Sequence, residues 1–490
     1  MPLTSPLALL RVDADSLAAN THPRHRHPAL DLKYIQSAVR DRNGFLPPLI
    51  DHTLASGLSA EQLADRVLAC RPRIAIVKAQ SWNLDTAIRC ARRLRAAGVV
   101  TIAVGQQVLH AARSPVTGWQ DAYDIALPGD AEAEAPRLVT RLLSGEKPAA
   151  LAASYTERMA TGRLLEIDDP DSLPIPHFDT SELAAYPFPF PLRRRPVHHW
   201  GYVLTAWGCP RACRHCSVVV RKSATATLRA RSIELVVDEV ARLADQGAQG
   251  ILFEDDSLCI DRRRFLGLCD ALIRRRLTLP WIANARPDEL DRERVAAAAA
   301  SGAALFKVGV DCAAPRLIER IAKARDGLAW IAAAENAFGY LDEANIGSVA
   351  LFMVGLPDEQ ATDVEASIKL ARRLRPDYVQ VQIYTPYPDT AIWAELSPAQ
   401  RNGSGTYHYG IRSESPSRIA AADLPKMQGA FYRRFYLDSA YFARHLARSW
   451  RHYLTPQALL QSAAHVSFLL RKAVSDREAP APAEPPNCQA

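Results

Sequence analysis

Residues 208–218 read GCPRACRHCSV, which places Cys209, Cys213 and Cys216 within eight residues. Three residues separate the first two thiols, and two separate the second from the third. A structural zinc site usually takes four ligands in two pairs, and no second Cys-x-x-Cys pair follows in the chain. Because soft thiolates also favour iron–sulfur clusters, three of them suit a cluster that leaves one iron open to an outside ligand.

The residues just before the cysteines, GYVLTAW at 201–207, form a short apolar run that is typical of a buried strand. Five further runs of this kind alternate with helical patterns, at 250–256, 280–286, 304–311, 348–355 and 377–384. Six strand–helix units predict a partial (β/α)6 barrel of parallel strands, with the active site at the carboxyl ends of the strands. The cysteines follow the first strand, so they fall in a loop where such a fold carries its chemistry.

The rest of the chain predicts separate regions around this barrel, which is expected at 197–395. Residues 1–150 alternate apolar runs with helical patterns, which predicts an α/β domain with a doubly wound parallel sheet. A Pro-rich and acidic stretch predicts a linker at 151–196. Residues 396–475 are expected to form a helical C-terminal region, and the Pro-, Ala- and Glu-rich tail at 476–490 is predicted to be disordered.

The composition argues against several classes of protein. Hydrophobic residues make up 48% of the chain, charged residues 23%, and the formal net charge is +7. No dense basic run with interleaved aromatic residues occurs, so no nucleic-acid partner is expected. The first residues, MPLTSPLALLRVDADS, lack the basic region of a signal peptide, and no run approaches the ~20 apolar residues of a membrane span. Nine scattered cysteines do not predict a disulfide framework, so a reducing, cytoplasmic location is expected.

The Cys-x-x-x-Cys-x-x-Cys motif after the first strand of a six-unit barrel resembles the radical S-adenosylmethionine (SAM) superfamily. Five later segments resemble, in order, the strand-end motifs of the branch that carries an N-terminal cobalamin-binding domain: RARSIELVVDEV, ILFEDDSL, LFKVGVDCAAPRLIERIAK, FMVGLPDEQATDVEASI and YTPYPDTAIW. The resemblance covers residues 200–395 and, more weakly, residues 10–150. This chain departs from the family pattern at His215, where an aromatic residue is usual, at Asp311, where Glu is usual, and at Asp389, where Gly is usual.

The resemblance implies a set of cofactor-binding residues. In the family, the open iron of a 4Fe-4S cluster binds the amino and carboxylate groups of SAM, and one electron from the cluster cleaves SAM to a 5'-deoxyadenosyl radical. The implied cluster ligands are Cys209, Cys213 and Cys216. The implied SAM-binding residues are Glu254, Asp255 and Asp256 for the amino group, Asn284 and Arg286 at the next strand end, with Arg286 for the carboxylate, Asp311 for the ribose and Gly355 for adenine.

Each of these positions also has a purely structural interpretation. The acidic residues at 254–256 are equally typical of a solvated turn, Arg286 of a surface ion pair, and Asp311 of a helix cap. Tyr384 and Tyr387, at the end of the sixth strand, are expected to line the substrate cavity, although an aromatic residue at such a site often only packs.

The N-terminal pattern resembles the cobalamin-binding fold, whose loops surround the lower face and the nucleotide tail of the corrinoid. Ser81, Gly105 and Gly129 fall at strand-to-loop transitions where that fold places small residues. An ordinary doubly wound domain, or one that has lost its cofactor, has the same pattern. The Asp-x-His-x-x-Gly loop of many cobalamin proteins is absent, so no histidine is expected to ligate cobalt. The nearest candidates are His22, His25, His27 and His52.

The function implied by the resemblance is a cobalamin-dependent radical SAM enzyme that methylates an unactivated carbon, or phosphorus, of a small-molecule substrate. One SAM would re-methylate the corrinoid and another would supply the radical, with a reductant such as flavodoxin or ferredoxin as partner. A non-methylating oxidative cyclase or rearrangement enzyme of the same branch is the alternative. An iron–sulfur electron-transfer or regulatory protein is the alternative from another class.

Overall fold

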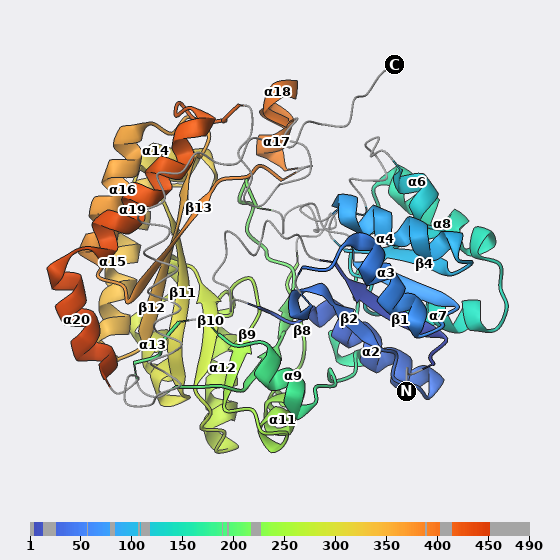
Figure 1. Ribbon diagram of the computed structural model, residues 1–490. Helices are drawn as coiled ribbons and strands as arrows, with labels where there is room; N and C mark the ends of the chain where they lie inside the picture. Colours follow the sequence, from blue (N-terminus) through green and yellow to red (C-terminus); the bar gives the residue numbers. More distant parts are fainter. Residues whose placement is uncertain are drawn as a thin grey trace.

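The computed structural model describes residues 4–12, 26–55, 57–78, 84–105, 108, 118–188, 190–193, 196–216, 227–387, 390–401 and 414–450. Figure 1 shows two parallel sheets with their helices, the N-terminal one in blue and a larger one in green to orange. Within the described ranges, no helix is long and apolar enough to cross a membrane.

The N-terminal sheet has five parallel strands in the order β2-β1-β3-β4-β5. The strands are β1 (Leu7–Arg11), β2 (Leu49–Asp51), β3 (Ile74–Lys78), β4 (Val100–Val104) and β5 (Ile125–Ala126). The helices of this region are α2 (Leu30–Asn43), α3 (Ala60–Ala69), α4 (Leu84–Ala96), α6 (Trp119–Ala122), α7 (Glu134–Leu143) and α8 (Pro148–Thr161).

Both faces of the N-terminal sheet are buried, which confirms the doubly wound fold predicted from the sequence. Helices α3 and α4 cover one face, and α2, α7 and α8 cover the other. Because successive side chains of a strand point to opposite faces, a strand covered on both sides reads as a continuous apolar run, as LALL in β1 does. Helix α8 begins at Pro148 and buries Leu151 and Tyr155 against this core, so the first part of the predicted linker packs with the N-terminal sheet.

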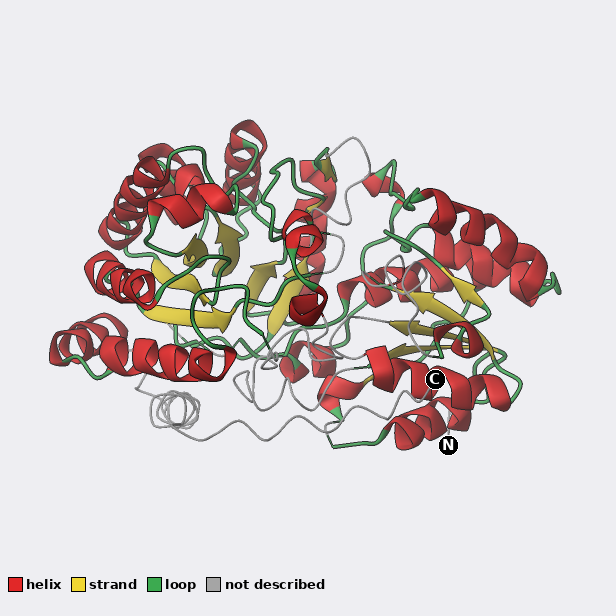
Figure 2. Cartoon of the chain, turned by 90° about the horizontal axis from the view of Figure 1, so that it is seen from above, coloured by secondary structure: helices red, strands yellow, loops and turns green. Residues whose placement is uncertain are grey.

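The second sheet has six parallel strands in sequential order and is open between its first and last strands, which confirms the partial barrel. The strands are β6 (Trp200–Val203), β9 (Gly250–Phe253), β10 (Trp281–Ala285), β11 (Ala303–Asp311), β12 (Gly347–Val354) and β13 (Tyr378–Ile383). The helices between them are α11 (Ile233–Asp245), α12 (Arg262–Arg274), α13 (Arg292–Ala300), α14 (Pro315–Arg320), α15 (Gly327–Glu343) and α16 (Ala361–Leu374). Figure 2 shows these helices on the outer side of the curved sheet.

The first barrel strand is shorter than the predicted 201–207. Strand β6 ends at Val203, and the chain then forms β7 (Ala206–Trp207), which pairs in antiparallel fashion with β8 (Arg229–Ala230). Thr205 lies at the turning point, where its backbone N–H and its hydroxyl donate to the Asp255 carboxylate at 2.7 and 2.5 Å. These hydrogen bonds direct the chain away from the sheet just before the cysteines, a long-range effect that the apolar run could not reveal.

Residues that follow helix α9 (Thr180–Ala185) close the amino end of the barrel. The ring of Phe188 packs on Trp200 at the start of β6, and that of Phe190 packs on Tyr378 at the start of β13. Arg193 forms a buried, forked ion pair with Asp377. The chemistry of the barrel is therefore confined to its other end, where the strands terminate.

The described parts of the predicted helical region, residues 396–401 and 414–450, contain α18 (Pro398–Arg401), α19 (Leu424–Tyr436) and α20 (Ser439–Ser449), and α17 (Ala391–Glu395) precedes them. Helix α19 covers the free edge of β13. The hydroxyls of Tyr432 and Tyr436 accept hydrogen bonds from the backbone N–H groups of Val381 and Val379 at 3.0 and 2.9 Å. Satisfying these groups removes an edge that would otherwise pair with other chains. The predicted disordered tail lies outside the described residues.

Candidate active site

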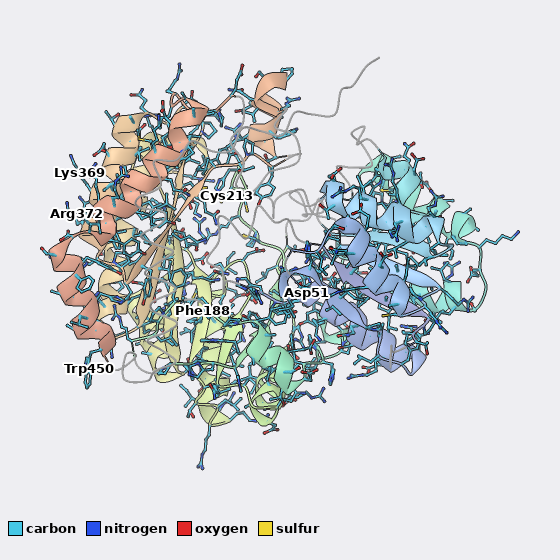
Figure 3. The ribbon with its side chains drawn as sticks, in the orientation of Figure 1. Asp51, Phe188, Cys213, Lys369, Arg372 and Trp450 are labelled. Atoms are coloured by element: carbon cyan, nitrogen blue, oxygen red, sulfur yellow. The ribbon has the colours of Figure 1, made fainter. Side chains whose placement is uncertain are left out.

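The three cysteines lie in one loop, residues 208–216, which leaves β7 at the carboxyl ends of the barrel strands. Cys213 is 8% exposed, and Cys209 and Cys216 are half-buried. Gly208 begins the loop with a φ of +85°, and a Cβ there would lie 2.8 Å from the carbonyl oxygen of Thr227, so only glycine fits this turn. Figure 3 shows Cys213 toward the end of the barrel opposite Phe188.

Two arginines inside the loop fasten it to the barrel. The backbone N–H of Arg214 donates to Ile321 at the end of α14 at 2.9 Å, and its guanidinium pairs with Glu395 of α17. Arg211 pairs with the buried carboxylate of Glu289 at 3.0 Å. Elements that are distant in sequence thus hold the cysteine loop from two sides.

Arg286, at the end of β10, points toward the cysteines. Its Nη1 lies 3.8 Å from Sγ of Cys213, and its guanidinium stacks on the ring of Trp330. Nε and Nη2 donate to both oxygens of Asp288 at 2.9 and 3.0 Å. In the structure, Arg286 therefore contacts Cys213, Trp330 and Asp288. The sequence suggested instead that it binds the carboxylate of SAM or forms a surface ion pair.

Asp311 ends β11 in the left-handed conformation, with a φ of +72°, and forms a 2.8 Å ion pair with Lys323. The pKa of Asp311 is lowered, because Lys323 and His215 outweigh the opposing effect of burial. Burial lowers the pKa of His215 to about 4, so this imidazole is neutral at neutral pH. A positive φ at a residue other than glycine is uncommon and marks strain of the kind found at functional sites.

The three acidic residues at the end of β9 have different surroundings. Glu254 accepts a 2.8 Å hydrogen bond from Nδ1 of His27; burial raises its pKa, but His27, Lys307 and Arg11 lower it to about 2. Asp255 is 4% exposed and directed at Thr205, and burial raises its pKa to about 6. Asp256 is exposed. The structure therefore does not bring the three carboxylates together around one ligand group.

The remaining predicted SAM and substrate residues lie at strand ends of the barrel. Asn284 donates to the carbonyl oxygen of Asp255 at 2.8 Å. Gly355 has a φ of +88°, and its N–H, with that of Leu356, donates to the buried carboxylate of Glu359. Tyr384 is buried against Trp330 and neighbouring apolar residues, which corresponds to the packing alternative, and Tyr387 is partly exposed.

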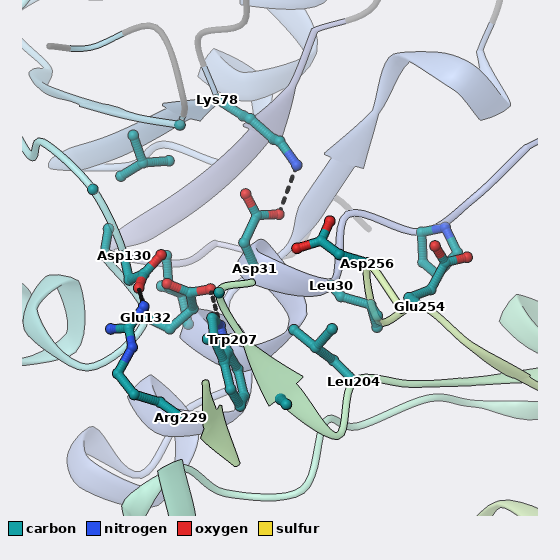
Figure 4. A pocket seen from close by; sticks show the side chains of 18 residues that line it. Leu30, Asp31, Lys78, Asp130, Glu132, Leu204, Trp207, Arg229, Glu254 and Asp256 are labelled. Carbon is teal, nitrogen blue, oxygen red and sulfur yellow. Dashed lines mark hydrogen bonds and ion pairs between the residues drawn. The ribbon is translucent and has the colours of Figure 1, made fainter. Parts of the chain in front are cut away.

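A cavity of about 260 Å³ lies between the two sheets. Gly105 and Gly129 line it from the N-terminal sheet, as do Lys78, Asp31, Asp130 and Glu132. Leu204, Trp207, Gly208, Arg229, Glu254 and Asp256 line it from the barrel side. Figure 4 shows the ion pairs Lys78–Asp31 and Arg229–Asp130 in this cavity, each 2.8 Å long. The carboxyl ends of both sheets therefore border one common cavity.

The structure describes only some of the residues that were predicted to bind cobalamin or considered as cobalt ligands. Ser81, His22 and His25 lie outside the described residues. Gly129 lines the cavity, but a Cβ there would lie 2.4 Å from the carbonyl oxygen of Leu165, so its small size also serves packing within the domain. The described cavity is smaller than the roughly 300–1,000 Å³ of pockets for drug-sized ligands, so it is too small to hold a whole corrinoid.

The donor set fits a cluster better than a single ion. No three His, Cys, Asp or Glu side chains among the described residues are grouped closely enough to hold one metal ion. Thiolates on a cubane each bind a different iron and so lie further apart than the ligands of one ion. Cys259, Cys269 and Cys312 are buried, and burial raises their thiol pKa values, to about 11 for Cys269. Among the described cysteines, Cys209, Cys213 and Cys216 share one loop, and Cys209 and Cys216 are partly exposed.

Several residues of this site were not identified from the sequence. They are Arg211, Arg214, Glu289, Lys323, Trp330 and Glu395. Most belong to helices or turns with ordinary amphipathic patterns, so no local signal distinguishes them. Lys323 is the last residue of the segment LFKVGVDCAAPRLIERIAK, but only its pairing with Asp311 reveals a role.

Comparison with known proteins gives the same family as the cysteine motif. Residues 204–371 match the model of the Radical SAM superfamily. An uncharacterized methyltransferase of Pyrococcus horikoshii is 28% identical over 75% of this chain and 78% of its own length. An anaerobic magnesium-protoporphyrin IX monomethyl ester cyclase of Cereibacter sphaeroides is 27% identical over 48% of this chain and 39% of its own length.

One solved structure relates both sheets to a known fold. The radical SAM methyltransferase TsrM of Kitasatospora setae, with cobalamin and a [4Fe-4S] cluster bound, superposes with a TM-score of 0.62 at 15% identity, over 89% of this chain and 90% of that chain. The likeness includes the N-terminal sheet as well as the barrel. Residues 204–371 therefore match a domain of the Radical SAM superfamily, and the chain as a whole shares its fold with the cobalamin-bound TsrM structure.

Proposed function

We propose that the protein is a cobalamin-dependent radical SAM methyltransferase that acts on an unactivated carbon, or phosphorus, of a small molecule. The observation that carries the proposal is the placement of three cysteines in one loop at the carboxyl end of an open barrel, beside a cavity shared with the N-terminal sheet. This arrangement puts a radical source and a large cofactor within reach of one substrate space.

Cys209, Cys213 and Cys216 would hold the 4Fe-4S cluster, whose chemistry is the one-electron cleavage of SAM. Arg211 and Arg214 position the loop through Glu289 and Glu395. Charge-assisted hydrogen bonds of this kind are stronger than neutral ones, so they hold the thiols in a defined orientation. A low-potential reductant such as flavodoxin or ferredoxin is the proposed source of the electron.

SAM would lie over the strand ends next to the loop. Glu254 is ionised at neutral pH and partly exposed, so it suits the amino group of SAM better than the enclosed Asp255 does. Asn284, Asp311 and the backbone at Gly355 are the other proposed contacts. Asp256 remains a candidate as an exposed carboxylate at the same edge.

The corrinoid would bind at the carboxyl edge of the N-terminal sheet. Ligands of open α/β sheets bind beyond the carboxyl ends of the strands, which is where Lys78, Gly105 and Gly129 line the cavity. The side chain of His27 is hydrogen-bonded to Glu254, which supports a corrinoid site without a histidine ligand to cobalt.

The similarity to the cyclase supports one alternative to methyl transfer. Its similarity covers 48% of this chain, so a non-methylating radical reaction is the second candidate. The methyltransferase relative matches 75% of the chain. Product analysis after incubation with SAM, cobalamin and a reductant separates the two, because only methyl transfer adds a methyl group to the product.

The cluster assignment is tested by changing its ligands one at a time. Cys209→Ala, Cys213→Ala and Cys216→Ala should each lose the charge-transfer absorbance of anaerobically reconstituted protein and all cleavage of SAM. Each variant removes one of only three thiolate ligands, which is why the loss should be complete. Iron content and absorbance are the measurements.

Cys259→Ala and Cys312→Ala are the matched controls, because both thiols are fully buried in apolar surroundings. These variants should keep the iron content of the parent protein. A complete cluster in Cys213→Ala would overturn the assignment.

A further inference from the structure

Two basic side chains lie beside Cys213 and share one aromatic surface. The guanidinium carbon of Arg286 is 4.6 Å from the centre of the Trp330 ring, and the Lys323 ammonium is 5.5 Å from it. Nη2 of Arg286 also donates to the carbonyl oxygen of Lys323 at 2.7 Å. A cation over an aromatic face is attracted by the ring, so Trp330 holds both charges in place.

Each cation is oriented by its own carboxylate. Asp288 receives Nε and Nη2 of Arg286, which directs the remaining nitrogen, Nη1, to the sulfur of Cys213 at 3.8 Å. Asp311 receives Lys323 at 2.8 Å. An arginine side chain stays protonated at physiological pH, and the ion pair with Asp311 favours the charged form of Lys323.

The other charged groups nearby do not cancel this arrangement. Glu289 approaches Nε of Arg286 at 3.7 Å but pairs more closely with Arg211, at 3.0 Å. Nη1 of Arg286, which contacts the Cys213 sulfur, therefore belongs to a guanidinium whose other edge is bound by Asp288.

Two cations and an N–H donor beside a ligand sulfur would raise the electron affinity of a cluster bound there. Reduction adds a negative charge to the cluster and its thiolates, so nearby positive charge and N–H donors to sulfur favour the reduced form. Partly buried charges are screened by salt less than exposed ones, so their effect on a neighbouring sulfur is larger.

We propose that Arg286 and Lys323 set the reduction potential of the cluster on Cys209, Cys213 and Cys216, raising it through positive charge and an N–H contact at Cys213. The proposal rests on the proposed function, because it requires that cluster. Trp330 and Asp288 are positioning residues that act through the two cations. The result is a cluster that the proposed flavodoxin or ferredoxin reduces more readily than it would without the two cations.

The test is a redox titration of the reconstituted full-length protein, followed by paramagnetic resonance of the reduced cluster. Arg286→Met and Lys323→Met should each shift the midpoint potential to more negative values while the iron content stays at the level of the parent protein. The double variant should shift it further. Arg286→Lys keeps the positive charge but loses the forked contact with Asp288. The midpoint potential of this variant should therefore lie between those of the parent protein and Arg286→Met.

Arg292→Met is the matched control. Arg292 also stacks on a ring of α15, that of Tyr340 at 4.5 Å, and pairs with Glu343 at 2.7 Å, but it is exposed. Its removal should leave the potential unchanged. Potentials equal to that of the parent protein in both Met variants, at full iron content, would overturn the proposal.

Loss of the cluster from both variants would also overturn the proposal, because the two cations would then serve assembly rather than potential. A parent protein that holds no cluster on its three cysteines would instead contradict the proposed function. The two failures are thus distinguished by the iron content of the parent.

Discussion

At the scale of single residues, Asp255 has the position of a ligand-binding residue but serves the structure of the fold. It stands among three acidic residues at a strand end, yet its carboxylate receives both the N–H and the hydroxyl of Thr205. These bonds shape the turn that leads to the cysteine loop. Glu254 and Asp256, its neighbours in sequence, line the cavity between the sheets instead.

The elevated pKa of Asp255 predicts a pH dependence of stability. Burial raises this pKa from 3.8 to about 6, so between these values the folded protein binds more protons than the unfolded chain. The contribution of Asp255 to the free energy of unfolding is therefore complete below about pH 4 and lost as the pH rises through about 6, by up to about 3 kcal/mol. Asp255→Asn should remove this part of the pH dependence.

Urea unfolding at pH 4.5 and pH 7.5 measures the effect on Asp255→Asn. The variant should gain stability relative to the parent protein as the pH rises. Asp270→Asn, which removes an exposed carboxylate on α12, is the control and should run parallel to the parent. Parallel curves for Asp255→Asn as well would contradict the assignment.

At the scale of elements, helix α15 supports the candidate site, because its Trp330 ring packs against Arg286 and Lys323. Its first turn is fixed by Asp326, which accepts from the N–H of Ala329 at 2.9 Å. Its start lies against α14, and the segment that joins the two helices carries Lys323, so Lys323 and Trp330 lie together. Neither helix has a local pattern that shows this role.

Two glycines of α15 predict opposite effects of substitution. A Cβ at Gly327 would lie 2.3 Å from Cα of Pro315, whereas nothing lies within 4 Å of one at Gly339. Gly327→Ala should destabilise the protein by about 1–3 kcal/mol through overpacking. Gly339→Ala should stabilise it by about 0.5–1 kcal/mol, because alanine restricts the unfolded chain.

Denaturant unfolding of the two alanine variants checks this contrast, and each serves as the control for the other. Equal effects would show that the contact between α14 and α15 is looser than described. Because Gly327 is close to Trp330, its variant should also weaken the support of Arg286 and Lys323.

At the scale of the whole molecule, Trp207 joins the two sheets. It is 4% exposed and packs with Tyr34 of α2, Ile167 and Leu173. Its indole N–H donates to Glu132 at 3.1 Å. Burial, with Asp130 and Asp31, raises the pKa of Glu132 to about 8, so its carboxyl is largely protonated at neutral pH and suits an enclosed interface.

Trp207→Leu should uncouple the two sheets. The loss of the ring and of its hydrogen bond should destabilise the protein by about 2–4 kcal/mol. Calorimetry should then resolve two unfolding transitions where the parent protein has one, because the N-terminal sheet and the barrel no longer support each other.

Trp450→Leu is the control, because Trp450 is 50% exposed and lies at the far edge of the barrel in Figure 3. It should unfold as the parent protein does. A single transition at the temperature of the parent in Trp207→Leu would show that the sheets are coupled elsewhere.

Much of this architecture could be predicted from local patterns. Apolar runs and helical periodicity identified both parallel sheets, and the spacing of Cys209, Cys213 and Cys216 identified the superfamily. These features are short-range, since a buried strand must be apolar along its length and the ligands of a loop must be close in sequence. The early end of β6 was not predictable, because it depends on the bond between Thr205 and Asp255, 50 residues apart.

The partners of the charged residues were decided only by the tertiary structure. The sequence shows an arginine at a strand end, but folding brings Lys323, from the segment after α14, and Trp330 of α15 to Arg286 and turns its Nη1 toward Cys213. The reason is physical: apolar burial follows from a residue's own type and neighbours, whereas a charge is stabilised by whichever distant group the packed chain brings within a few ångströms.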